Sequence, residues 1–120
     1  CIRDSDNTAL ATGGVARTQT SSVSFESTAT TIMSFNQASY RSAELMITLN
    51  DANNTEYATM KAMVVHNGTT AFGNVYSIVN TGSTDLGTIT FNYNSGTVEV
   101  KAVSTGGAQT ALVQYSLQAV

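Results

Sequence analysis

The chain has 120 residues and a mass of 12.6 kDa, with 42% hydrophobic and 11% charged residues and a formal net charge of −3. This length suits one domain with a core of its own, and a single Cys excludes a fold held together by internal disulfides. Five Lys and Arg residues spread along the chain give no basic patch for a phosphate backbone, so a nucleic-acid partner is not expected.

Hydroxyl and amide side chains replace the charges that usually solvate a protein surface. The sequence contains 19 Thr, 13 Ser and 10 Asn, whereas charged residues make up about a quarter of an average domain. It contains no apolar run of about 18 residues, so we expect no transmembrane helix. The composition predicts a soluble domain of extracellular type.

Residues 1–20 contain few apolar side chains, no sustained periodicity and a Gly-Gly pair, which predicts an extended N-terminal arm or linker. Cys1 at the first position is compatible with the lipid-bearing residue of a processed bacterial lipoprotein. An inert residue at a frayed end is the simpler interpretation.

Two short strands are expected next, around a turn at 26–29. The run that follows, 40–51, places Ala43, Leu45, Ile47 and Leu49 on one face. A period near two predicts a half-buried strand.

A long strand is expected at 57–66, with Ala58, Met60, Ala62 and Val64 on one side. The other side holds Tyr57, Lys61, Met63 and Val65, so we expect the second half of this strand to be buried on both faces. Asn67-Gly68 then predicts a type I′ turn, because that turn needs positive φ at both central residues. Strand 57–66 is therefore expected to pair with 70–79.

Three further runs alternate in the same way up to the end of the chain. Ile89, Phe91 and Tyr93 share one face, and the hairpin turn Asn94-Ser95-Gly96 follows them. The inward residues of the last two strands are expected to be Val98, Val100 and Ala102, then Ala111, Val113, Tyr115 and Leu117.

Seven to eight short strands without a helical pattern predict an all-β fold, an antiparallel β-sandwich or jelly-roll-like domain over 21–120. Pro is absent and charges are few, so the sheet edges are poorly protected against pairing with another chain. The fold class therefore favours a protein that has partners.

The sequence offers no pattern for catalysis or for a cofactor. His66 is the one imidazole, and no nucleophile motif and no metal-ligand spacing accompanies it, so a structural turn histidine is expected. The acidic and amide clusters at 4–7 and 50–56 lack the spacing of a calcium loop and are interpreted as solvated turns.

The tyrosines fall about one to each expected strand, which permits a sugar-stacking platform, although packing at the core and rim is the favoured interpretation. They are Tyr40, Tyr57, Tyr76, Tyr93 and Tyr115.

From Tyr40 to the end, the order and spacing of three pieces are more specific than any one of them: VVHNGTTAF at 64–72, the Thr-Gly turn at 81–82, and SGTVEV at 95–100. Together they resemble a β-rich domain that recurs in virion structural proteins of tailed phages, especially phages of marine cyanobacteria. The hairpin signature of that domain falls on His66, Asn67, Gly68 and Thr69. Val75-Tyr76-Ser77 departs from its usual Glu-Tyr-Gly form, and residues 1–39 lie outside the match.

The resemblance implies a non-enzymatic virion structural protein, in a capsid decoration, neck or tail-fibre module, whose partners are copies of itself and other virion proteins. It carries over no catalytic residue, cofactor or metal. Two alternatives stay open: a fibre tip domain that binds a receptor or a host-surface glycan, and a subunit of a bacterial surface filament or lipoprotein.

Overall fold

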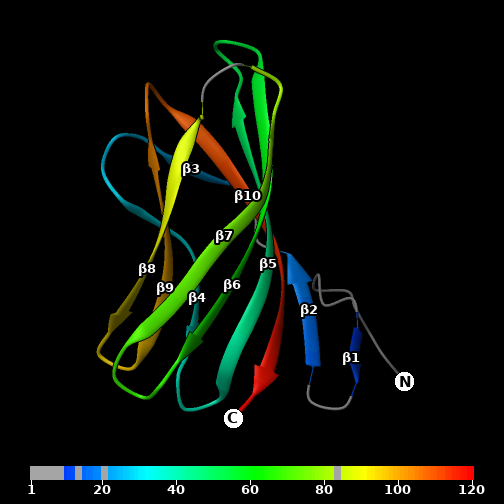
Figure 1. Cartoon of the computed structure of the whole chain (residues 1–120), viewed down its shortest axis with the longest axis vertical. Coiled ribbons are helices and arrows are strands. Elements are labelled where there is room, and N and C mark those ends of the chain that lie inside the picture. The colour runs from blue at the N-terminus through cyan, green and yellow to red at the C-terminus, as the bar shows by residue number, and fades with distance from the viewer. Residues whose placement is uncertain (1–9, 13–14, 20–21, 83–84) are drawn as a thin grey trace.

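The computed structural model describes residues 10–12, 15–19, 22–82 and 85–120, with side chains from residue 22 onward. Its elements are ten strands (Figure 1): β1 (Leu10–Thr12), β2 (Val15–Gln19), β3 (Val23–Phe25), β4 (Thr30–Asn36), β5 (Tyr40–Asp51), β6 (Glu56–His66), β7 (Ala71–Asn80), β8 (Gly87–Asn94), β9 (Thr97–Ser104) and β10 (Gln109–Ala119). No helix in the described part of the chain is long and apolar enough to cross a membrane.

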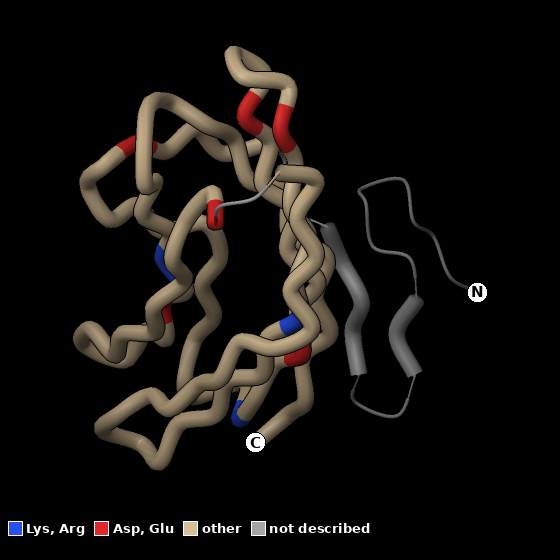
Figure 2. The backbone as a smooth tube through the Cα atoms, turned by 45° about the horizontal axis from the view of Figure 1, so that its top comes forward, with Lys and Arg blue, Asp and Glu red and all other residues tan. Residues whose placement is uncertain are grey.

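The strands form two antiparallel sheets that pack face to face (Figures 1 and 2). The larger sheet, sheet A, has the order β1-β2-β10-β5-β6-β7, and β3 also pairs with β10. The smaller, sheet B, has the order β4-β9-β8. An all-β antiparallel sandwich is thus confirmed, and β3 to β10 supply eight strands, within the seven to eight that the sequence analysis expected.

The core is built from the alternating positions of strands that the sequence identified. In β5, Leu45 is 1% exposed and Ile47 and Leu49 are fully buried. Val98 and Val100 of β9 oppose them from sheet B and are also fully buried. Val, Ile and Leu at every second position place one apolar face of each sheet against the other, which is the main source of stability in a sandwich.

A register shift in β4 explains an apolar run that does not alternate. Ile32 and Met33 are neighbours in sequence, and both are buried. The pairing of β4 with β9 shifts between Thr31 and Met33, so the strand carries one extra residue there. Such a β-bulge lets two consecutive side chains face the same layer.

The hairpin expected at 94–96 is confirmed and its turn is of type I′, whereas the type I′ turn expected at Asn67-Gly68 does not form. Between β8 and β9, Ser95 and Gly96 have φ of 49° and 88°, as this turn requires. Between β6 and β7, the predicted two-residue turn at Asn67-Gly68 is wrong. The connection spans 67–70, with Gly68 at φ 96° and a hydrogen bond from Asn67 N to Thr70 O. The expected pairing of the two strands is nevertheless confirmed.

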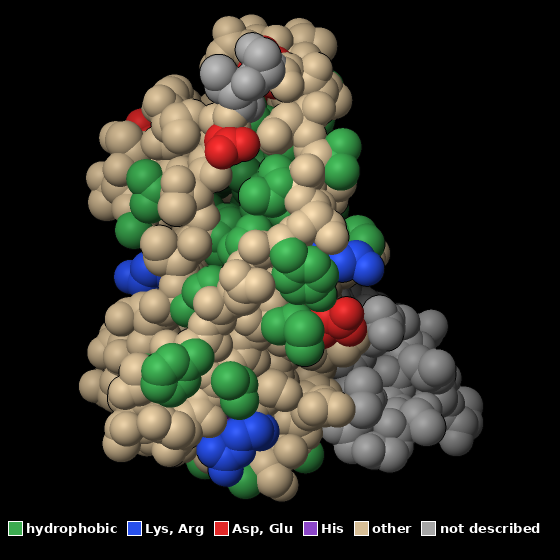
Figure 3. Space-filling view, in the orientation of Figure 1, with side chains coloured by type: hydrophobic (Ala, Val, Ile, Leu, Met, Phe, Trp, Pro, Cys, Tyr) green, Lys and Arg blue, Asp and Glu red, His purple; other side chains and the backbone are tan. Residues whose placement is uncertain are grey.

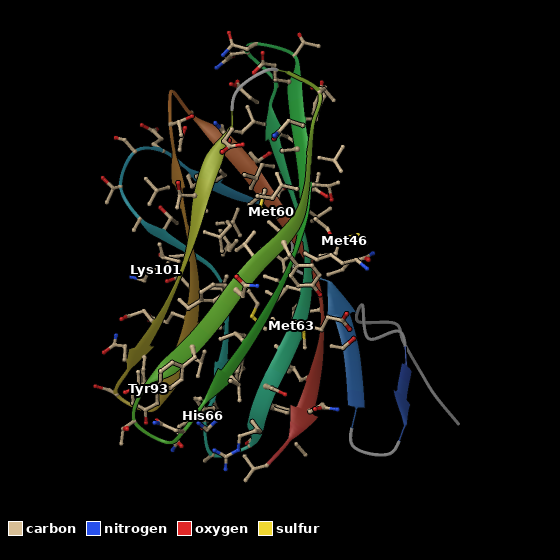
Figure 4. The ribbon with its side chains drawn as sticks, in the orientation of Figure 1. Met46, Met60, Met63, His66, Tyr93 and Lys101 are labelled. Atoms are coloured by element: carbon tan, nitrogen blue, oxygen red, sulfur yellow. The ribbon has the colours of Figure 1, made fainter. Side chains whose placement is uncertain are left out.

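Burial on both faces of β6 is wrong. Met60 and Val64 are buried, whereas Met63 and Val65 are 55% and 42% exposed. Sheet B covers one side of sheet A, and Figure 4 shows Met60 toward the interior while Met46 lies on the opposite side. The second apolar set of β6 therefore faces outward.

The segment expected to be an extended arm contains two strands within its described residues. β1 pairs with β2, and β2 pairs with β10 from Val15 to Gln19. The boundary between an arm at 1–20 and a domain at 21–120 stays a prediction. Cys1 lies outside the described residues.

A close contact between the two sheets depends on the absence of a side chain at Gly73 of β7. A Cβ built at Gly73 would lie 2.5 Å from ring atoms of Phe91, which β8 supplies from the other sheet. We expect Gly73→Ala to lower the free energy of unfolding by about 1–3 kcal/mol, because the Phe91 ring must move out of its position. Urea unfolding followed by circular dichroism measures this loss.

Gly107→Ala is the matched control, since nothing lies within 4 Å of a Cβ at Gly107. Its effect should stay within about 0.5 kcal/mol. Equal losses in the two variants would contradict the close contact.

Candidate interaction surface

The outward side of sheet A carries a group of apolar side chains that the protein leaves uncovered. We define the outer apolar face as Met46 of β5, Met63 and Val65 of β6, and Phe72, Tyr76 and Val79 of β7. Phe72 and Val79 are 54% and 63% exposed. Figure 3 shows hydrophobic side chains gathered over these strands.

The strand register brings these residues together. Val65 pairs with Phe72, and Lys61 pairs with Tyr76, so the side chains of each pair share one face of the sheet. Met63 of β6 also pairs with Glu44 of the neighbouring strand β5, on the same face of the sheet. A set of neighbouring apolar side chains at one place, rather than scattered ones, is the pattern typical of an interaction surface.

The surface is hollowed next to Phe72. A shallow depression of about 350 Å³ lies between Ser42, Met63, Val65 and Phe72. Its lining is mostly apolar, so it suits an apolar side chain of a partner better than a charged group.

Two opposite charges border the apolar residues. Glu44 and Lys61 are the charged residues on the outward side of β5, β6, β7 and β10, four strands that are described throughout. Within the described residues, neither side chain has an ion-pair partner. Figure 2 shows one basic and one acidic position close together on this layer.

The outer face of sheet B is different, because Asn92, Glu99 and Lys101 on it are polar and interact with one another. The Asn92 amide donates to Glu99 Oε1 at 3.1 Å and holds the pKa of the Glu99 carboxyl below its usual value. Lys101 Nζ, 3.7 Å from the same oxygen, acts in the same direction. Most of the large exposed apolar side chains in the described residues therefore lie on the outward side of sheet A.

His66, the first residue of the hairpin signature, is buried at the end of β6. Its Nε2 is 2.8 Å from Tyr40 O, and its Nδ1 accepts a hydrogen bond from Gly68 N at 3.0 Å. The ring therefore takes the tautomer with the proton on Nε2, and it lies 6.3 Å from the Phe35 ring. Both nitrogens are used inside the fold, which leaves none for a substrate or a metal.

The other three signature residues build the loop itself. Asn67 Oδ1 accepts hydrogen bonds from Thr69 N, Thr69 Oγ1 and Thr70 N at 2.8–3.1 Å. Gly68 takes the positive φ, and its carbonyl accepts a bond of 2.9 Å from Tyr93 Oη of sheet B. Figure 4 shows His66 and Tyr93 at the same end of the sandwich. The signature thus ties a loop of sheet A to sheet B.

The five tyrosines do not form one platform. Tyr40, Tyr93 and Tyr115 are half-buried and pack against the core. Tyr57 and Tyr76 lie on the outward side of sheet A, where Tyr57 pairs with Asn50 and Tyr76 pairs with Lys61. Tyr76 belongs to the outer apolar face.

The acidic cluster at 50–56 forms a turn. Asp51 is buried, and its Oδ2 accepts a hydrogen bond of 2.9 Å from Asn54 Nδ2. Among the described residues, no three His, Cys, Asp or Glu side chains come together as a metal site would require. The cluster at 4–7 lies outside the described residues.

No protein-family model and no curated protein matches the chain. Solved structures similar to it include two tailspikes of phages that infect Acinetobacter baumannii. The tailspike of phage AM24 aligns with a TM-score of 0.55 and 13% identity, over 88% of this chain and 26% of the tailspike. The tailspike gp49 of phage Fri1, a capsular polysaccharide depolymerase, aligns with a TM-score of 0.50 and 10% identity, over 89% of this chain and 18% of gp49. The chain thus has the fold of about a quarter or less of each tailspike.

Proposed function

We propose that this chain is a non-enzymatic structural module of a tailed-phage virion, in a tail fibre or tailspike, and that it works by packing against other subunits. The shared fold with parts of two phage tailspikes supports the virion assignment. The hairpin motif at 64–72 supports it independently and keeps virion proteins of marine cyanobacterial phages as the proposed relatives.

The observation that carries the packing role is the outer apolar face. Exposing large apolar side chains to water is unfavourable, and the free energy falls when a partner covers these half-exposed residues. They lie on regular strands, which hold the surface in one shape and reduce the entropy lost on association. A rigid apolar face with few charges suits stable assembly.

The second candidate is a module that binds a host-surface glycan. The Fri1 tailspike acts on a capsular polysaccharide, and Tyr76 on the outer apolar face offers a ring on which a sugar can stack. A glycan array on the purified chain separates the two functions. The packing role predicts no glycan signal above that of an unrelated β-sandwich.

Immunogold electron microscopy tests the proposed location. Antibodies raised against this chain should label purified phage particles on the tail. Label on the capsid would indicate a capsid decoration protein instead of a tail module. Particles without label, together with labelled bacterial envelopes, would contradict a virion protein and favour the filament or lipoprotein alternative.

A further inference from the structure

Four of the exposed side chains on the outward side of β5 and β6 form an arrangement that is complementary to itself. Glu44 pairs with Met63, and Met46 pairs with Lys61. The four therefore form the corners of a rectangle, with the methionines on one diagonal and the two opposite charges on the other. The neighbouring strands β7 and β10 contain no charged residue.

We infer that this face is the contact between two copies of the chain, related by a two-fold axis along the line from Met46 to Met63. The inference rests on the proposed function, since it names the surface through which subunits pack. Rotation about this axis sets each methionine against its counterpart in the second copy. It also exchanges the ends of the other diagonal, so Glu44 of each copy meets Lys61 of the other.

Strand geometry makes this contact feasible. Neighbouring strands lie about 4.8 Å apart, and alternate residues along a strand lie about 6.8 Å apart. The axis is therefore inclined by about 35° to the strands, and the two sheets cross at about 70°, nearer the orthogonal class of sheet packing. The sideways offset between Glu44 and the opposing Lys61 is about 3 Å, which their flexible side chains can span.

Charge favours a second copy over another occupant. The chain has a net charge of −3, so two copies repel each other overall, whereas the outward side of β5 and β6 presents one charge of each sign. An isologous contact turns that pair into two attractive pairs per dimer. The apolar side chains contribute most of the affinity, and the charges fix the register.

Sedimentation velocity on the full chain tests the inference. We expect a concentration-dependent dimer for the native sequence. Lys61→Glu or Glu44→Lys alone places like charges together twice and should raise the dissociation constant at least about tenfold. The double variant E44K/K61E restores both pairs and should return the constant to within about threefold of the native value.

Lys101→Glu is the matched control, because it makes the same charge change on the outer face of sheet B and should leave the dissociation constant within about twofold. Glu44 and Lys61 are exposed, so all variants should keep the native melting temperature to within about 3 °C. A native chain that stays monomeric, or a double variant no better than the single ones, would overturn the inference. Either result leaves the immunogold test of a virion location unaffected.

Discussion

Ile47→Asp should leave the chain largely unfolded, whereas Met46→Asp, one residue earlier in β5, should leave it folded. Ile47 is fully buried between the two sheets, so the new carboxylate would lie in the core without a partner. The cost of removing the packed side chain and burying a charge exceeds about 4 kcal/mol, comparable to the total stability of a small domain. Met46 points to water, and the same substitution there should cost about 1 kcal/mol or less.

The dispersion of amide signals in a proton–nitrogen correlation spectrum measures the outcome. Met46→Asp should keep the dispersed spectrum of the native chain, and Ile47→Asp should collapse it. Equal behaviour of the two variants would mean that β5 does not separate a buried face from an exposed one.

His66→Ala is expected to have the second large effect, a loss of about 2–4 kcal/mol in the free energy of unfolding. The substitution leaves Tyr40 O and Gly68 N without their hydrogen-bond partner and opens a cavity beside Phe35. Thr69→Ala, in the same loop, removes only an exposed hydroxyl bond to Asn67 and should cost less than about 0.5 kcal/mol.

Denaturant unfolding measures both losses, and nitrogen chemical shifts of the imidazole add an independent check. The hydrogen bonds of the ring use Nε2 as the donor and Nδ1 as the acceptor. A ring protonated on Nδ1, or a loss no larger than that of Thr69→Ala, would contradict the structural role of His66.

The sequence predicts the alternation within single strands well, because each such pattern is local. Leu45, Ile47 and Leu49 have apolar side chains at every second position with polar ones between them, so their buried face is evident. The turn at Ser95-Gly96 is evident for the same reason, since two adjacent residues must take positive φ there.

Features that depend on distant parts of the chain are not predictable in this way. Met63 and Val65 are as apolar as their buried neighbours, and only the presence of one covering sheet instead of two leaves them exposed. The connection at 67–70 takes four residues because the Asn67 side chain satisfies the loop amides, while Tyr93 from another sheet holds its carbonyl.

The sequence analysis does not predict the outer apolar face, because its exposure depends on how many sheets cover sheet A. Its signal is nevertheless present in the sequence. Met46 in β5 and Met63 in β6 belong to a second apolar set, offset by one residue from the core set. A second set on the opposite side of a strand indicates either a further layer of the fold or a surface for a partner. The fold distinguishes these possibilities, because no third layer covers sheet A in the described residues.

Oxidation of the four methionines by dilute hydrogen peroxide tests most directly whether the chain is a sandwich that associates through the outer apolar face. Met46 and Met63 are 45% and 55% exposed, whereas Met33 and Met60 are 4% exposed and serve as internal references. In dilute solution the first two should oxidise at least about tenfold faster than the references, measured by mass spectrometry at low conversion. At concentrations where the chain self-associates, the rates of Met46 and Met63 should fall toward those of Met33 and Met60. Rapid oxidation of Met33 or Met60, or rates of Met46 and Met63 that do not change with concentration, would contradict the account.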